Sequence, residues 1–157
     1  MFTIYVYILE TLADWELGYV TSELHSRRFF KKDAECVSFK TVSYSKEPIH
    51  TMGGLTTALA NFGLLDNRRH TSNGQGFLEM FSPTYKGQSF YIDEPSVADN
   101  NLITANPTGS LLWAKQIIER LGVFQSDTLE FWYEYFSTGK AESFFALMQT
   151  LPPNNKK

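Results

Sequence analysis

The sequence predicts an α/β fold in which most strands of the sheet run parallel. Residues 2–9, FTIYVYIL, form a nearly continuous run of β-branched and aromatic residues, which is typical of a strand buried on both faces of a parallel sheet. Apolar residues at helical spacing follow at once, between residues 13 and 24. A second strand-like segment, VSFKTVSY at residues 37–44, then completes a β-α-β unit.

The middle of the chain predicts short elements. Residues 55–64 have the spacing of a short helix with Gly63 near its end, and GFLEMF at residues 76–81 predicts a helical turn. Two strand-like pieces, FYIDEPSVA and NLITA, follow within residues 89–105 and are separated by the turn-forming Asp99-Asn100-Asn101. A hairpin or a bent strand fits this pattern.

The C-terminal third predicts three helices. Asn106-Pro107-Thr108-Gly109-Ser110 opens a helix that Gly122 ends, and residues 126–151 indicate two aromatic helices around Gly139. An aromatic stripe of this kind is more often core or dimer interface than a ligand site. We therefore expect an α/β domain over residues 1–125, a helical extension over 126–151 and a disordered tail over 152–157.

Composition and charge restrict the function classes. A chain of 157 residues, 43% of them hydrophobic, can bury the core of one domain. The formal charge of −3 offers no attraction for nucleic acid or an anionic membrane, so a small molecule or a protein is the expected partner. The single cysteine excludes an internal disulfide, and the N-terminal apolar run lacks signal-peptide flanks; we expect a cytoplasmic protein.

Glu16 is the candidate site residue. Ligands of open parallel sheets bind beyond the carboxyl ends of the strands, and the loop after the first strand, residues 10–16, falls there. Glu16 in the first helical turn can point at a site above the sheet. The alternative, favoured by spacing alone, is that Asp14 and Glu16 only complement the positive end of the helix dipole.

Other reactive residue types form no recognisable site. Cys36 opens the second strand, where the sequence shows no positive charge, base or helix N-terminus to activate a thiol, so we interpret it as structural. The three histidines, His25, His50 and His70, lack the spacing of metal ligands. No dinucleotide fingerprint or nucleophile elbow is present, and we expect neither a metal nor a cofactor.

Five segments, in order along the chain, form the pattern of one protein family. They are Ala13-Asp14-Trp15-Glu16, Thr51-Met52-Gly53-Gly54-Leu55, residues 58–66, His70-Thr71-Ser72-Asn73, and Asn101-Leu102-Ile103-Thr104-Ala105 with the helix after it. On these segments most of the chain resembles the PfpI/ThiJ superfamily, in particular the intracellular-protease-like branch found in bacilli. This resemblance implies a class I glutamine amidotransferase-like fold, which is a flavodoxin-like, three-layer α/β/α sandwich.

The resemblance also implies a gap. In the family the glycine pair is followed by further strands and helices, including the strand that carries the nucleophilic cysteine, whereas here Leu55 runs directly into Thr56. Glu16 matches the family's acidic residue that tunes this cysteine. The resemblance thus implies a peptidase-like or deglycase-like cysteine hydrolase, inactive here because its nucleophile segment is missing. The alternative is a non-catalytic, stress-related binding or chaperone-like module.

Loss of central strands has a consequence for assembly. It exposes apolar faces and strand edges, so we expect a homo-oligomer, with a peptide or small molecule as substrate if any activity remains. The C-terminal aromatic residues are expected to cover the exposed surface, by folding back or by packing against a second copy. They are Phe131, Trp132, Phe136, Phe144 and Phe145.

Overall fold

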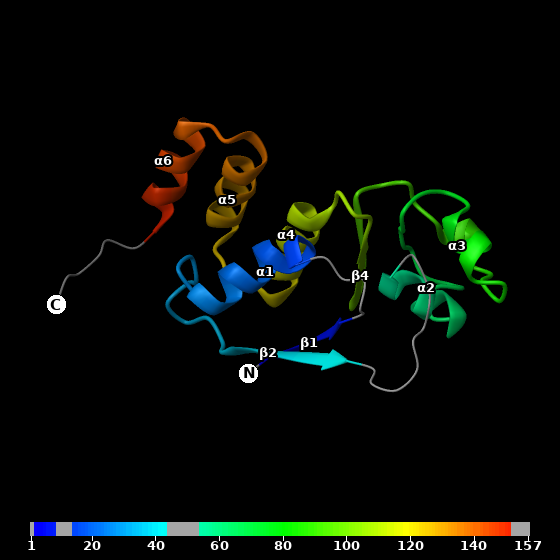
Figure 1. Ribbon diagram of the computed structural model, residues 1–157. Helices are drawn as coiled ribbons and strands as arrows, with labels where there is room; N and C mark the ends of the chain where they lie inside the picture. Colours follow the sequence, from blue (N-terminus) through cyan, green and yellow to red (C-terminus); the bar gives the residue numbers. More distant parts are fainter. Residues whose placement is uncertain (1, 9–13, 44–53, 152–157) are drawn as a thin grey trace.

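The computed structural model describes residues 2–8, 14–43 and 54–151. The strands in these segments are β1 (Phe2–Ile8), β2 (Val37–Ser43), β3 (Ser96–Asp99) and β4 (Leu102–Ala105). The helices are α1 (Asp14–Ser26), α2 (Gly54–Asn61), α3 (Phe77–Phe81), the short 3₁₀ turn η1 (Gln88–Phe90), α4 (Ser110–Leu121), α5 (Ser126–Thr138) and α6 (Ala141–Thr150). Figure 1 shows α1, α4, α5 and α6 gathered in one part of the molecule, with α2 and α3 beyond β4.

The predicted β-α-β unit is confirmed. Strands β1 and β2 pair in parallel from Phe2 opposite Val37 to Ile8 opposite Ser43, and α1 connects them. The helix ends where Arg27 takes a left-handed conformation, with φ of 53°. This turn brings the chain back toward the start of β2.

Residues 96–105 form the predicted hairpin. Strands β3 and β4 pair antiparallel, and Asn100 supplies the turn with φ of 54°. The first strand-like piece is shorter than expected, because Phe90 belongs to η1 and Tyr91 forms only an isolated parallel bridge with His70. Pro95, which lacks an N–H for a ladder, directly precedes β3.

The described strands form two separate two-stranded sheets, β1–β2 and β3–β4. The α/β class is confirmed; among the described strands the parallel ladder is that of β1 and β2, beside the isolated parallel bridge of His70 and Tyr91. The chain between β2 and β3 explains why the two strand pairs are not joined into one sheet. Its described part, residues 54–95, forms helices and turns instead of additional strands that could join them.

The main core lies between α1 and the three C-terminal helices. Its largest fully buried side chain is Trp132 of α5, which packs among α1 and α4 residues such as Val20 and Ile118. Of the aromatic residues expected to cover the sheet, Trp132 is buried and Phe131 half-buried in this core, while Phe136, Phe144 and Phe145 are exposed; that they cover the sheet stays a prediction. The other members of the buried cluster are Leu24, Phe29, Val37, Ala114, Val123, Phe124, Leu129 and Leu147.

A smaller core supports the α2–α3 region. Ala60, Leu65, Leu78 and Tyr85 pack together there. Helices α4, α5 and the segment after α2 end at glycines in the left-handed conformation, as the sequence predicts for Gly63, Gly122 and Gly139.

No helix within the described segments has the length and apolar character needed to cross a bilayer. The expected disordered tail, residues 152–157, lies outside the described part of the chain.

Candidate functional site

The backbone of Glu16 lies where the sequence predicts it. Glu16 belongs to the first turn of α1, which begins at Asp14, shortly after the carboxyl end of β1 at Ile8. Since β2 runs parallel to β1, this is the carboxyl edge of the β1–β2 pair. The side chain of Glu16 itself lies outside what the structure describes, so its direction stays a prediction.

Cys36 lies at the opposite edge of this sheet. It directly precedes Val37, which pairs with Phe2 at the amino edge. Seven residues of strand separate the two edges by about 20 Å at 3.3 Å per residue. Helix α1 runs back between the same edges, because Arg27 just after its end lies beside Cys36. The chain's single cysteine and the backbone of Glu16 are therefore at opposite edges of the sheet.

One expectation about Cys36 is wrong. The sequence around Cys36 indicates no positive charge near this thiol, but the Arg27 guanidinium donates from Nη1 to Cys36 Sγ at 3.8 Å. Nine residues separate them, and the left-handed Arg27 that ends α1 brings them together. The thiol is exposed, so reagents in solution can reach it.

His70 is a buried histidine that the sequence did not single out as special. Its ring is 0% exposed and lies between the Arg68 carbonyl and the Tyr85 hydroxyl, each 2.6 Å from a ring nitrogen. A carbonyl oxygen only accepts, so we assign Nδ1–H as the donor to Arg68 and Nε2 as the acceptor from Tyr85. Burial raises the pKa of Tyr85 above its ordinary value, with smaller contributions from Glu79, Tyr91 and Asp66 in the same direction, which keeps the hydroxyl protonated as a donor.

The His70–Tyr85 pair serves the structure and does not form a reaction centre. A general base must reach its substrate, and the His70 ring has no exposed surface. Gly87 packs so tightly here that an added Cβ would lie 2.4 Å from the Leu65 carbonyl oxygen and 3.0 Å from His70 Cε1. The pair therefore fixes the loop between Leu65 and Tyr91 to the smaller core.

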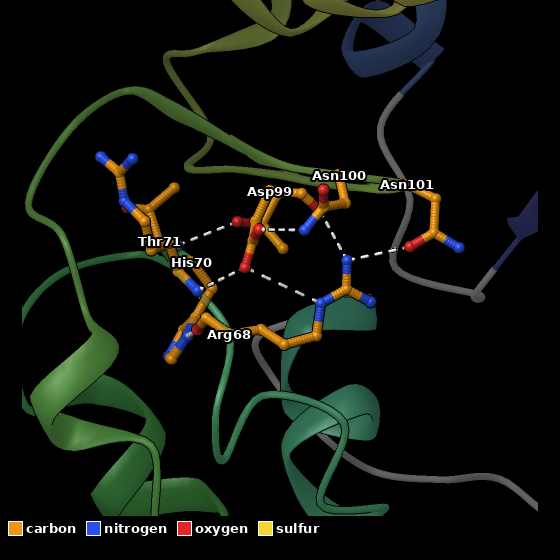
Figure 2. A network of polar contacts seen from close by, with 8 residues as sticks. Arg68, His70, Thr71, Asp99, Asn100 and Asn101 are labelled. Atoms are coloured by element: carbon orange, nitrogen blue, oxygen red, sulfur yellow. Dashed lines mark hydrogen bonds and ion pairs between the residues drawn. The ribbon is translucent and has the colours of Figure 1, made fainter.

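Arg68 and Asp99 connect this loop to the hairpin, as Figure 2 shows. Arg68 Nη2 donates to the Asp99 carbonyl at 2.5 Å and to Asn101 Oδ1 at 3.0 Å, while the Arg69 N–H donates to Asp99 Oδ2 at 2.9 Å. The Thr71 N–H donates to Thr104 Oγ1 at 2.9 Å. These contacts hold residues 68–71 beside the hairpin without a strand ladder. No sequence motif identifies them, since the partners are about 30 residues apart.

A shallow hollow of about 290 Å³ lies between the hairpin and α4. Its polar lining comes from Asn100 at the turn and from Gln116, Glu119 and Arg120 on α4. Gln116 is held by Ser96 Oγ, which donates to its side-chain oxygen at 2.7 Å. The volume is at the lower limit for small-molecule sites, and no motif in the sequence points to these lining residues. Within the described residues, no group of three or more histidine, cysteine, aspartate or glutamate side chains could hold a metal ion; His50 lies outside them.

Comparison with known proteins decides the family. Residues 39–120, just over half of the chain, match the model of the DJ-1/PfpI family. The chain is 34% identical over 203 residues to the "Uncharacterized protease YoaZ" of Bacillus subtilis (strain 168), an alignment that covers 94% of this chain and 97% of the relative. The chain belongs to the DJ-1/PfpI family.

Further relatives agree with membership of the DJ-1/PfpI family. The "Uncharacterized protease YdeA" of the same organism is 31% identical over 93 residues, 58% of this chain and 46% of the relative. The thiJ/pfpI family protein from Bacillus anthracis superimposes with a TM-score of 0.85 at 32% identity, over 96% of this chain and 98% of that one. The DJ-1 superfamily protein Atu0886 from Agrobacterium tumefaciens, at 18% identity, shares the fold with a TM-score of 0.69, over 88% and 99% of the two chains.

The comparisons confirm the resemblance to the PfpI/ThiJ group and its α/β fold. They also give a length difference within the family. The alignment with YoaZ extends over 203 residues while this chain has 157, so at least 46 aligned positions have no residue in this chain.

Proposed function

We propose that this chain is a DJ-1/PfpI-type protein that has lost thiol-dependent hydrolysis. The observation that carries the proposal is the separation of Cys36 from Glu16, which lie at opposite edges of the β1–β2 pair. A carboxylate can tune a thiolate only within a few ångströms, and the chain has no second cysteine to stand near Glu16. We infer hydrolysis as the reaction class because both Bacillus subtilis relatives are named as proteases.

We propose that the loss lies at the junction of Leu55 and Thr56. Both residues lie in α2, which begins at Gly54, so the described chain is already helical from the second glycine of the pair. The family resemblance implies a strand after that pair, followed later by the strand that bears the nucleophile. The YoaZ alignment contains at least 46 positions without a residue in this chain, which supports the loss of a segment of about that length.

The purified chain is expected to hydrolyse neither peptides nor glycated adducts above the uncatalysed background. The measurement compares this chain with Cys36→Ser and Glu16→Gln, uses an established protease as the positive control for the peptide assay, and includes purified YoaZ as the longer relative. Equal background rates for all three forms of this chain support the proposal. Turnover that Cys36→Ser abolishes would make Cys36 a nucleophile and would overturn the proposal. Turnover that survives Cys36→Ser would contradict the expected lack of hydrolysis and would reveal a hydrolase that needs no thiol.

A second candidate function is a non-catalytic binding module of the chaperone type. The observation that favours it is an aromatic surface on α5 and α6, which consists of Tyr135, Phe136, Phe144 and Phe145. Phe145 is 62% exposed, Phe136 and Phe144 are exposed as well, and ring contacts of 5.2–5.8 Å join all four. Exposed aromatic rings are typical of surfaces that bind other proteins.

The aromatic surface is expected to suppress aggregation of a heat-unfolded client enzyme. Phe145→Ser should weaken this suppression, whereas Phe62→Ser, which changes a 78% exposed side chain at the end of α2, should not.

The expected homo-oligomer is tested with the same variants by light scattering over a concentration series. Self-association through the aromatic surface should also weaken in Phe145→Ser. Equal behaviour of both variants and the parent chain would remove the aromatic surface as a binding site.

A further inference from the structure

The contact between α1 and α5 contains a buried acid. Glu23 of α1 is 3% exposed, and its Oε2 has no hydrogen-bond partner. Trp132 of α5 is 0% exposed, and its indole Nε1 also lacks a partner. A buried polar atom without a partner is rare and costly in a native protein, and here two of opposite hydrogen-bonding character belong to one interface.

Aromatic packing fixes this interface around the acid. Tyr19, one helical turn before Glu23, makes edge contacts with Trp132 at 6.3 Å and with Phe136 at 5.6 Å between ring centroids. Phe124 also contacts Trp132 edge to face, with 6.2 Å between the ring centroids. Burial of Oε2 in this apolar packing makes solvation of a charged carboxylate poor, so the neutral acid is the form that favours the closed interface.

We propose that Glu23 is a proton-sensitive contact that sets how tightly the α5–α6 hairpin is held against α1. The protonated carboxyl group allows the helices to pack as the structure shows. The ionised group draws water, which requires α5 to move away from α1. The α5–α6 hairpin is the part that moves, because among the described residues only the short segment 122–125 connects it to α4.

The charged groups around Glu23 do not neutralise it. On its own helix and the following turn, Arg28 is the charge that acts on Glu23, and its effect is smaller than that of burial. On the elements packed against α1, Lys115 of α4 is engaged elsewhere, since its ammonium lies 2.8 Å from Glu130 of α5 and 4.9 Å from the Tyr133 ring centroid. The connection at residues 122–125 carries no charge.

The pKa of Glu23 fits this role. Burial raises the pKa above 4.5, while the attraction of the Trp132 indole N–H and the charge of Arg28 lower it; no hydrogen bond of standard geometry forms between Glu23 Oε2 and the indole. Because the closed form binds the proton more tightly, its extra stability is complete below pH 4.5 and is lost as the pH rises through the elevated value. The interface therefore loosens toward alkaline pH.

Hydrogen exchange of the full chain tests the proposal. Protection factors for residues 126–150 in the parent chain are expected to fall between pH values below 4.5 and about pH 8, by roughly tenfold for each unit of pKa elevation. Glu23→Gln, a neutral side chain of the same shape, should abolish the fall and keep protection high throughout. Glu134→Gln, the same change at an exposed position of α5, should behave like the parent chain.

A second variant keeps the test independent of how Glu23→Gln folds. Arg28→Gln removes a charge that lowers the pKa of Glu23 and should move the fall in protection to higher pH. The proposal is overturned if the parent chain shows no fall, if Glu23→Gln shows the same fall as the parent chain, or if Arg28→Gln leaves its midpoint unchanged.

Discussion

Gly109→Ala is expected to lower the free energy of unfolding by about 3 kcal/mol, at the upper end of the usual cost of overpacking. Gly109 lies directly before α4, against the residue that precedes β3. A Cβ at this position would lie 1.9 Å from the Pro95 carbonyl oxygen and 2.7 Å from the Pro95 carbonyl carbon. These are backbone atoms, so no side-chain rotation can relieve the clash.

Neither side of this contact is free to shift. The Asn106 N–H donates to the same Pro95 oxygen at 3.0 Å, and the Trp113 N–H donates to the Gly109 carbonyl at 2.8 Å. Urea unfolding followed by circular dichroism measures the effect. Gly18→Ala is the matched control, because a Cβ there meets nothing within 4 Å and should stabilise α1 by about 0.5–1 kcal/mol. Equal midpoints for the two variants would contradict the close approach of α4 to the hairpin.

Trp132→Ala is expected to cost about 3–5 kcal/mol, the range for removing a buried aromatic side chain from a core. Trp132 has no exposed surface, and its ring contacts Tyr19 of α1, Phe124 and Phe136. The cavity left behind would open the main core on the side of α5. This cost is a large part of the total free energy of unfolding of a typical domain, so we expect extensive unfolding of the variant.

The same urea experiment distinguishes two views of residues 126–151. If these helices share one core with α1 and α4, Trp132→Ala moves a single unfolding transition that all probes report. Phe145→Ala on exposed α6 serves as the control and should change stability by no more than about 0.5 kcal/mol. A separate transition for the C-terminal helices, with α1 and α4 unaffected, would instead support their being an independent extension.

Local signals in the sequence predict most elements of the described fold. The apolar run gives β1, the Asp99-Asn100-Asn101 turn gives the hairpin, and the glycines at 122 and 139 give the ends of α4 and α5. Each of these signals acts within a few residues, where propensity and turn chemistry decide the conformation. The length of β3 was overestimated because β-prone residues before Pro95 found no neighbouring strand.

The contacts that matter for chemistry are less accessible from sequence. The order of strand and helix is enough to place the backbone of Glu16 at the carboxyl edge of β1. The approach of Arg27 to Cys36 depends on a left-handed residue that is not glycine, which composition does not reveal. The meeting of Glu23 with Trp132 depends on how α5 folds back over α1, and helical spacing alone would read Glu23 as a solvated residue.

The two strand pairs differ in how soon each can form during folding. Strands β3 and β4 join residues within ten positions of each other, so their hairpin can close in about 1–10 μs without help from the rest of the chain. Phe2 must meet Val37 across 35 positions, a longer loop whose closure is entropically costlier and is aided by prior formation of α1. On the ribosome, the uncharged β1 therefore leaves the exit tunnel before β2 and stays unpaired until β2 follows, so its apolar residues are exposed to nascent-chain chaperones during that interval.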